Sequence, residues 1–347
     1  MRVGVIQGNG IGPEIVAATI QVLEATKIDF EWVDVEIGDE AIEQYGHPLP
    51  PHSVDLLREL KYAFKGPFVV EKMKGRLLCT QPDGTQMIYP SLNNAIRREL
   101  GLFVCPRPIK GVKNISGAYE DFDVVIMREI TEDVYAAIEH SIGDVAAECV
   151  KLTTREAAIR VAQYSFEYAR RHGRKKVTCV HKANAISITD GLFLACFREV
   201  AARFPDIESD DVMVDAAAYY LVTDHRRFDV ITTSNQYGDI LSDLCAGLVG
   251  SLGLAPGGNI GFDVSVFEAS HGAAPDIAGQ GIANPTAMIL SGAFMLRHMG
   301  FDREAGVVEH AVWDVLEERQ ALTPDLGGSA TTAEYTQAVV AKVEQRI

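Results

Sequence analysis

Two aspartates, Asp239 and Asp243, stand four residues apart in the segment SNQYGDILSD, whose apolar positions favour a helix. At that spacing both carboxylates lie on one face of a helix, one turn apart. Carboxylates this close repel each other unless a cation or a proton lies between them, and hard divalent cations such as Mg2+ take oxygen ligands. The pattern therefore indicates a metal site, with a solvated acidic helix face as the alternative.

A second group of residues favours an anionic ligand. Arg97 and Arg107 share the stretch SLNNAIRRELGLFVCPRP with Ser91 and Asn93, and Arg128 lies at the end of an apolar, strand-like run. Ser91 suits the N-cap of the helix that follows it. A guanidinium donates to two carboxylate oxygens at once, so three arginines beside a small polar pair favour a multiply anionic ligand. Each arginine alone is also compatible with a surface salt bridge.

Composition narrows the classes of partner. The chain has 347 residues and a net charge of −16, which argues against nucleic acid. No apolar run reaches the roughly 18 residues of a membrane span. The six cysteines are scattered without a CxxC pair, which is typical of reduced thiols, and an initial strand leaves no room for a signal peptide. We therefore expect a cytoplasmic protein without a membrane partner.

The elements that must position these residues alternate between strand and helix. Apolar runs predict strands, and period-3.6 patterns between them predict helices. The predicted strands are 3–8, 30–37, 123–129, 175–181, 228–234 and 264–270, and the predicted helices are 13–27, 154–173, 188–204, 237–250, 284–300 and 303–320. This alternation predicts α/β layers with a largely parallel sheet.

The opening segment GNGIGPE is close to a dinucleotide-binding turn. Gly8 and Gly10 match the first two glycines of G-x-G-x-x-G, and Asp34 could serve as the ribose-binding acid. Position 13, however, holds proline, which suits the first turn of a helix. We interpret the segment as a structural strand-to-helix turn that holds no pyrophosphate.

The segment REITEDVY, from Arg128 to Tyr135, resembles a signature of the metal-dependent β-decarboxylating dehydrogenases, the isocitrate and isopropylmalate dehydrogenases. Further segments match this family in order, from residue 3 to about residue 330: VIQGNGIGPE, FKGP, SLNNAIRRELGLFVCPRP, HKANAI, YGDILSD, APGGNIG and FEASHGAAPDIAGQGIANP. The resemblance implies an α/β fold of two domains around a mixed, largely parallel sheet that is not a true Rossmann fold. Its large domain would be 1–102 with 251–347, and its small domain 103–250.

The resemblance also implies roles for single residues. Arg97, Arg107 and Arg128 would bind substrate carboxylates, and Tyr135 and Lys182 would be the acid–base pair. Asp215 would join Asp239 and Asp243 as ligands of Mg2+ or Mn2+. In the family, the lysine and the first aspartate are shared across a dimer interface, so a homodimer is expected, with segment 136–152 as its arm. Without the family, Tyr135 would be interpreted as a packing residue and Lys182 as a surface lysine.

The cofactor is expected at the loop SHGAAPDIAGQGIANP, residues 270–285. By resemblance, its binding residues are His271, Gly272, Ala274, Asp276, Ile277 and Asn284. His271 and the small residues after it would let the backbone approach the nucleotide, and Asn284 would bind the adenine edge. The backbone of the opening turn GNGIGPE would pack on this loop. A carboxylate at Asp276 accepts hydrogen bonds from both ribose hydroxyls and repels a 2′-phosphate, so NAD is predicted over NADP.

The substrate is expected to be isocitrate or a close isocitrate-like 2-hydroxy acid. Ser91 and Asn93 resemble the residues that bind the third acidic arm of isocitrate, and an isopropyl group would leave both unpaired. Several positions depart from the family pattern: an insertion at 68–90 that brings Lys72, Lys74 and Arg76, and Ile130, Ile186, Ser187 and Ala216. Loops tolerate insertions. The departures also leave open an isocitrate analogue such as 3-phosphonomethylmalate, or 3-isopropylmalate, homoisocitrate or tartrate.

Two other classes of function account for part of this pattern. A non-catalytic regulatory subunit tends to lose acid–base or metal residues, which this chain keeps. A metal-dependent hydrolase or lyase would use the aspartates but not the Asp276 loop. NADH formation separates both from a dehydrogenase.

Overall fold

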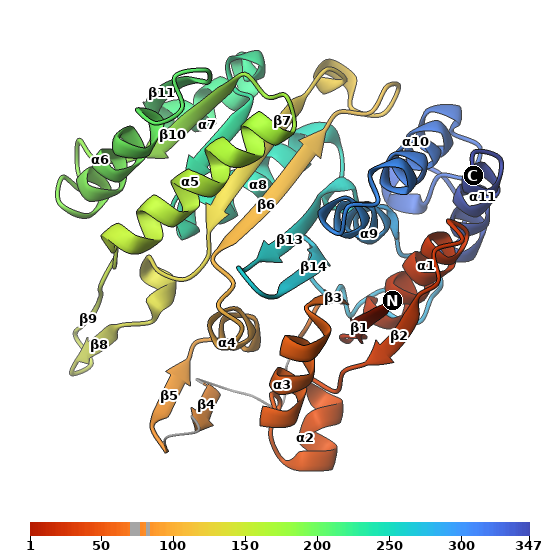
Figure 1. The fold of residues 1–347 in the computed structure, drawn as a ribbon, viewed down its shortest axis with the longest axis horizontal. Helices are drawn as coiled ribbons and strands as arrows, with labels where there is room; N and C mark the ends of the chain where they lie inside the picture. Colours follow the sequence, from red (N-terminus) through yellow and green to blue (C-terminus); the bar gives the residue numbers. More distant parts are fainter. Residues whose placement is uncertain (70–76, 81–83) are drawn as a thin grey trace. The chain divides into compact units, whose positions relative to one another are not determined.

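The computed structural model describes residues 1–69, 77–80 and 84–347 (Figure 1). The chain divides into two compact α/β units. Unit 1 comprises Met1–Lys74, Ile109–Asp121 and Ala246–Ile347, and unit 2 comprises Gly75–Pro108 and Phe122–Cys245. Relative to the domain boundaries expected from the sequence, this division assigns 75–102 to unit 2, and 109–121 and 246–250 to unit 1.

Unit 1 contains strands in the order β13-β14-β3-β1-β2. They span β1 (Arg2–Ile6), β2 (Glu31–Asp34), β3 (Tyr62–Lys65), β13 (Pro256–Ile260) and β14 (Ser265–Ala269). All these neighbours pair in parallel except β13 and β14, which are antiparallel. The helices are α1 (Gly12–Glu24), α2 (Asp39–Tyr45), α3 (Pro51–Leu60), α9 (Thr286–His298), α10 (Asp302–Glu318) and α11 (Thr332–Glu344). Short 3-10 turns lie at η1 (Gly117–Tyr119), η4 (Leu252–Leu254) and η5 (Pro324–Leu326).

Helix α9 forms the centre of unit 1. Every residue from Thr286 to Leu296 is buried, which is expected of a helix that is apolar on all sides. It packs against α1, α10 and β13. This core fixes the start of α9, where the predicted cofactor loop ends.

Unit 2 contains strands in the order β11-β10-β12-β7-β6. They span β6 (Val104–Lys110, whose last two residues belong to unit 1), β7 (Asp123–Glu129), β10 (Lys176–His181), β11 (Glu208–Met213) and β12 (Val230–Thr233). β10 pairs in parallel with β11 and β12, and β12 with β7. The helices are α4 (Leu92–Glu99), α5 (Arg155–Arg171), α6 (Thr189–Ala201), α7 (Val214–Thr223) and α8 (Asn235–Val249), with 3-10 turns η2 (Val134–Ala136) and η3 (His225–Arg227).

Several predicted site residues follow the carboxyl ends of these parallel strands. Arg128 lies next to the end of β7, Lys182 comes directly after β10, and Asp215 comes two residues after β11. Helix α8, which carries Asp239 and Asp243, follows β12. Open parallel sheets bind ligands at this edge, so the topology of unit 2 gathers residues that are far apart in the sequence.

Two small hairpins extend unit 2. In the insertion, β4 (Leu77–Thr80) pairs antiparallel with β5 (Gln86–Tyr89); Lys72, Lys74 and Arg76 lie outside the described residues. The predicted dimer arm folds as β8 (Glu139–Ile142) and β9 (Ala146–Cys149), also antiparallel. Both strands of this second hairpin are exposed throughout.

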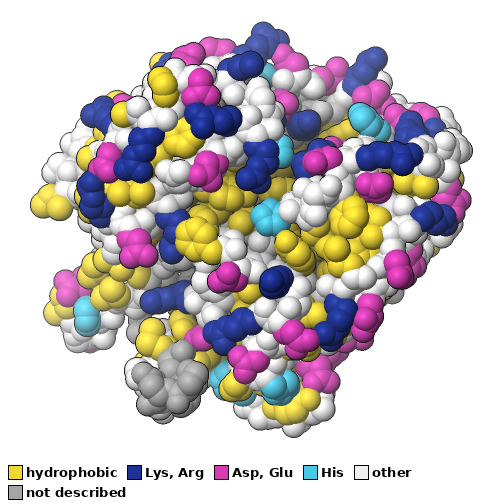
Figure 2. Space-filling model, in the orientation of Figure 1, with side chains coloured by type: hydrophobic (Ala, Val, Ile, Leu, Met, Phe, Trp, Pro, Cys, Tyr) yellow, Lys and Arg dark blue, Asp and Glu magenta, His cyan; other side chains and the backbone are white. Residues whose placement is uncertain are grey.

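The fold class expected from the sequence is confirmed: the protein is α/β with mixed, largely parallel strand pairing. On the face drawn in Figure 2, acidic and basic side chains are interspersed. Among the described helices, none combines the length and the apolar character needed to cross a membrane.

Candidate active site

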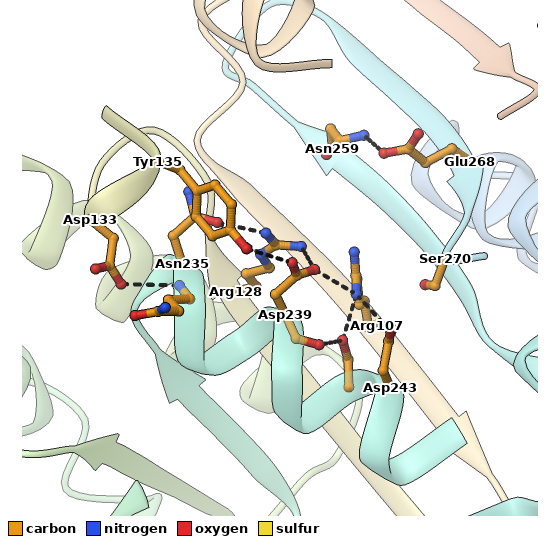
Figure 3. A network of polar contacts seen from close by, with 12 residues as sticks. Arg107, Arg128, Asp133, Tyr135, Asn235, Asp239, Asp243, Asn259, Glu268 and Ser270 are labelled. Carbon is orange, nitrogen blue, oxygen red and sulfur yellow. Dashed lines mark hydrogen bonds and ion pairs between the residues drawn. The ribbon is translucent and has the colours of Figure 1, made fainter. Parts of the chain in front are cut away.

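The two aspartates lie on α8 as predicted, beside arginine. Arg107 Nη1 is 3.6 Å from a carboxylate oxygen of Asp239 and 3.7 Å from one of Asp243. Helix α8 comes very close to β7, because a Cβ on Gly238 would lie 2.7 Å from Arg128 Cγ. A glycine before Asp239 therefore allows the helix to bring its carboxylates to the arginines (Figure 3).

Arg128 is the most buried of the three predicted arginines, with 3% of its surface exposed. Its Nε and Nη2 donate to Asn235 Oδ1 at 3.0 and 2.7 Å, and its Nη1 forms an ion pair with Asp239. Burial, together with the positive charges of Arg107 and Arg97, lowers the pKa of this guanidinium to about 10, although the charge of Asp239 opposes the change. The three arginines thus lie close enough to interact electrostatically.

Arg107 contacts the same helix one turn later. Its Nη1 donates to Ser242 Oγ at 2.5 Å. Burial raises the pKa of the nearby Asp243 carboxyl, and the charge of Asp239 adds to this while Arg107 opposes it. A carboxylate with a raised pKa gains from a cation bound beside it.

Tyr135 completes this group. Its hydroxyl donates to Asp239 Oδ2 at 2.9 Å. Burial raises the pKa of the phenol, and this hydrogen bond raises it further. The phenol is therefore protonated at neutral pH, as a proton donor must be. We refer to these residues as the acid cluster: Arg107, Arg128, Tyr135, Asp239 and Asp243.

Lys182 and Asp215 form a separate, more exposed pair. Lys182 Nζ lies 2.5 Å from Asp215 Oδ1, and this hydrogen bond lowers the pKa of the carboxyl. Within residues 1–69, 77–80 and 84–347, no three His, Cys, Asp or Glu side chains gather as a metal site. A single chain thus brings Asp239 and Asp243 together without Asp215.

The acid cluster suits a divalent metal as far as one chain can supply ligands. Asp239 and Asp243 provide carboxylate oxygens, the type that Mg2+ and Mn2+ prefer. Mg2+ is commonly held by one or two protein carboxylates together with substrate oxygens. In this structure the arginines compensate the negative charge of the aspartates.

The predicted substrate-arm residues begin α4. Ser91 is its N-cap, and its hydroxyl accepts from the amide of Asn94 at 3.2 Å, as expected from the sequence. Asn93 Oδ1 is buried and has no hydrogen-bond partner among the described residues. Buried polar atoms without a partner are rare and often mark a site for a ligand.

The cofactor loop predicted for 270–285 contacts the opening turn of the chain. Ile11 N donates to Ala273 O at 2.9 Å, and a Cβ on Gly10, whose φ is +61°, would lie 2.1 Å from that oxygen. The packing of GNGIGPE on this loop is therefore confirmed. Ala274 has a φ of 38°, a backbone conformation that is uncommon outside glycine.

Side chains of this His271 loop have contrasting environments. His271 Nε2 is buried without a hydrogen-bond partner in the part of the chain that the structure describes, and burial lowers the pKa of the ring. Gly272 and Asp276 are exposed, and Ile277 is half-buried. Asn284, by contrast, donates to Asp325 Oδ2 at 3.0 Å and accepts from Thr286 N at 3.0 Å. These contacts engage the Asn284 side chain just before α9, and its role in binding adenine stays a prediction.

The sequence interpretation missed two residues that support the acid cluster. Asn235 accepts twice from Arg128 and donates to Glu132 O at 3.2 Å, and Ser242 accepts from Arg107. Asn235 stands at the expected strand-to-helix boundary, where an amide residue is ordinary. Its position before the predicted helix was the one signal available.

Comparisons with known proteins identify the family of the chain. A family model described as Isocitrate/isopropylmalate dehydrogenase matches residues 2–339. The chain is 42% identical over 342 residues to a probable isocitrate dehydrogenase [NAD] subunit alpha, mitochondrial, of Drosophila melanogaster, covering 99% of this chain and 87% of that protein. It is 44% identical over 343 residues to a 3-isopropylmalate dehydrogenase of Archaeoglobus fulgidus, covering 99% of each. The crystal structure of isocitrate dehydrogenase from Methylococcus capsulatus superposes with a TM-score of 0.90 at 45% identity, covering 99% of both chains.

Proposed function

The chain belongs to the isocitrate/isopropylmalate dehydrogenase family, and from this premise we propose that it catalyses NAD-dependent, metal-dependent oxidative decarboxylation of isocitrate or a close isocitrate-like 2-hydroxy acid. The family and these relatives indicate an oxidoreductase of the decarboxylating dehydrogenase type. The observation that carries the specific proposal is the convergence of Arg107, Arg128 and Tyr135 on Asp239. At this point the chain brings together arginines for an anionic substrate, a carboxylate for a metal and a phenol that can donate a proton.

The residues of the chain would divide the reaction as follows. Arg107 and Arg128 exchange their aspartate partners for substrate carboxylates, with Arg97 contributing positive charge. Lys182 removes the proton of the 2-hydroxyl as hydride leaves C2. Loss of carbon dioxide leaves an electron pair at C3, which Tyr135 protonates. When bound, Mg2+ or Mn2+ supplies Lewis-acid stabilisation of the substrate oxygen, and NAD supplies the hydride acceptor.

The third arm of the substrate supports isocitrate over 3-isopropylmalate. Asn93 Oδ1 has no partner among the described residues, so its amide is free to turn and to donate through Nδ2 to a carboxylate arm, which an isopropyl group cannot accept. Overall identity does not separate the two substrates, since both kinds of relative lie near 42–44%. The deciding measurement is kcat/KM with NAD+ and Mg2+ for isocitrate, 3-isopropylmalate, homoisocitrate, tartrate, malate and 3-phosphonomethylmalate. Isocitrate is expected to rank first, and a tenfold better value for another acid would replace it.

Cofactor choice is proposed from Asp276, which is exposed on the His271 loop. Its carboxylate can accept from ribose hydroxyls and repels a 2′-phosphate. A higher kcat/KM with NAD+ than with NADP+ is expected, and an Asp276→Ser variant is expected to narrow the difference. Preference of the parent enzyme for NADP+ would refute this part of the proposal.

We further propose a homodimer in which each active site takes Lys182 and Asp215 from the second chain. The absence of a three-carboxylate group within the described part of one chain supports this arrangement. Mixing inactive Lys182→Met and Tyr135→Phe chains, after joint unfolding and refolding, is expected to restore activity, because each hybrid dimer has one intact site. If a mixture shown to contain hybrid dimers stays inactive, the active sites are not shared between chains. A non-catalytic subunit is excluded if the parent chain alone forms NADH.

A further inference from the structure

A buried lysine outside the acid cluster lies between two carboxylates in unit 2. Lys151 Nζ is 2.8 Å from Asp190 Oδ1 and 3.7 Å from Asp133 Oδ1. Both aspartates are almost fully buried, and 12% of the lysine side chain is exposed. Burial lowers the pKa of this lysine, but the hydrogen bond to Asp190 and the charges of both aspartates outweigh it, so the pKa is raised. Lys151 is therefore a charged link between two segments far apart in the sequence.

Asp133 connects this lysine to the loop of Tyr135. Its carboxylate accepts from Val134 N at 2.8 Å and from Gln236 N, at the start of α8, at 3.0 Å. Its backbone has a φ of 70°, a conformation that an aspartate keeps only where its surroundings hold it. The acceptor bonds of Asp133 thus tie the 3-10 turn carrying Tyr135 to the helix carrying Asp239.

Asp190 connects the same lysine to Lys182. It lies in the first turn of α6, and its Oδ2 accepts from the backbone N of Lys182 at 2.7 Å. Asp190 therefore holds the backbone of Lys182, the residue whose side chain pairs with Asp215.

Lys151 also contacts the start of α8 directly. Its ammonium lies 4.0 Å from the centre of the Tyr237 ring and 3.5 Å from Ser234 Oγ. Next to it, Leu152 exchanges backbone hydrogen bonds with Asp133. Cation–π and charge-assisted contacts from one ammonium to three segments give that ammonium a fixed place.

We propose that Lys151 is a positioning residue, which holds the Tyr135 turn, the Lys182 turn and the start of α8 in one arrangement. It touches none of the reacting groups; it acts through Asp133 and Asp190. Its effect on turnover rests on the proposed function, whereas its effect on the two turns does not. Supporting residues of this kind typically change activity about 10- to 100-fold when they are removed.

The test compares Lys151→Met with Lys176→Met. Lys176 is a matched control in the same unit, because it is 19% exposed and also pairs with two carboxylates, Asp210 at 2.9 Å and Glu208 at 3.3 Å, but contacts neither turn. Amide hydrogen exchange is expected to speed up at 131–137 and 182–188 in Lys151→Met and to stay unchanged there in Lys176→Met. This readout holds whatever the substrate proves to be.

For turnover, Lys151→Met is expected to lower kcat about 10- to 100-fold, with KM for the acid changed less than threefold. Lys151→Arg, which keeps the charge, is expected to recover part of the rate. Adding Asp190→Asn to Lys151→Met is expected to cost little more, because partners in one network are not additive. If Lys151→Met does not fold, Lys151→Arg and Lys151→Gln carry the same comparison.

Unchanged exchange at both turns in a folded Lys151→Met or Lys151→Gln chain would overturn the proposal, as would an equal loss of kcat in Lys176→Met. If exchange speeds up as expected but the parent enzyme turns over none of the acids, the positioning role stands and the proposed function fails.

Discussion

The acid cluster of unit 2 and the His271 loop of unit 1 are built from different parts of the polypeptide. In the acid cluster, buried and half-buried side chains make the contacts, as with Arg128 between Asn235 and Asp239. In the loop, the defining contacts are backbone ones, from Ile11 N to Ala273 O and from Gly10 to the same oxygen. The acid cluster therefore depends on the charged and polar side chains that it contains. The packing of the His271 loop depends on the absence of a side chain at Gly10.

This difference leads to different responses to substitution. Changing a charged group in the acid cluster removes a chemical function or leaves a buried partner unpaired. Changing Gly10 alters only how closely the backbone of the opening turn packs on the backbone of the His271 loop. We therefore expect effects on kcat and on the KM for the acid from the first region, and effects on the KM for NAD+ from the second.

The largest effect is expected for Lys182→Met. Loss of the proposed proton acceptor should lower kcat by roughly 10²- to 10⁴-fold, the usual contribution of general acid–base catalysis. The KM for the acid should change little, because the arginines remain. Steady-state kinetics of NADH formation measure this, with Lys176→Met as the control. A kcat within threefold of the parent would remove Lys182 from the mechanism.

The next effect is expected for Arg128→Lys. The substitution keeps the charge but loses the planar fork that donates twice to Asn235 and once to Asp239. Hydrogen bonds to charged groups are worth about 1.5–3 kcal/mol, so the KM for the acid should rise roughly 10- to 100-fold. The exposed Arg170, which binds Asp206 through Nε and Nη2, provides the control: Arg170→Lys should leave KM unchanged. Equal behaviour of the two variants would contradict carboxylate recognition by Arg128.

A smaller and different effect is expected for Gly10→Ala. Its Cβ would meet Ala273 O at 2.1 Å, whereas a Cβ on Gly46, with a φ of +71°, would meet nothing within 4 Å. Both variants place alanine at positive φ and should lose stability by about 1–3 kcal/mol. Only Gly10→Ala should also raise the KM for NAD+, by roughly tenfold if one hydrogen bond is lost. If Gly46→Ala raises it equally, the opening turn does not support the cofactor loop.

The same contrast explains what the sequence could predict. The aspartates and arginines of the acid cluster were identifiable because their types carry the chemistry, whereas Tyr135 was identified only through the family resemblance. Strong periodicity placed elements well: the strand expected at 123–129 is β7 (Asp123–Glu129). The antiparallel strand β13 (Pro256–Ile260) was not predicted, because its sequence PGGNI has low strand propensity. Its pairing with β14 comes from tertiary contacts.

The Lys151 network also could not be inferred from the sequence. Asp133, Lys151 and Asp190 are spread over 58 positions, and each alone is typical of a solvated surface residue. Only the parallel arrangement of β7, β10 and β12 brings their segments together. Buried charged groups with no local sequence signal are therefore where the structure adds most to the sequence.

The smallest effect is expected for Glu129→Gln, which changes a residue next to Arg128 of the acid cluster and is measured as a change in stability with pH. Burial raises the pKa of Glu129 from 4.5 to about 6, although it accepts from Thr131 N and Glu132 N. Between these values the folded chain binds more protons than the unfolded chain, so this residue makes folding less favourable as pH rises from about 4.5 to 6. A shift of this size corresponds to about 2 kcal/mol. Urea unfolding at pH 4.5 and pH 7 should therefore show that the free energy of unfolding of Glu129→Gln rises by about 2 kcal/mol relative to the parent at the higher pH.

Glu334, whose pKa is lowered by its hydrogen bonds to Thr331, provides a control of opposite sign: Glu334→Gln should lose stability relative to the parent at pH 7. A difference between parent and Glu129→Gln that is the same at both pH values would show that Glu129 does not titrate in this window.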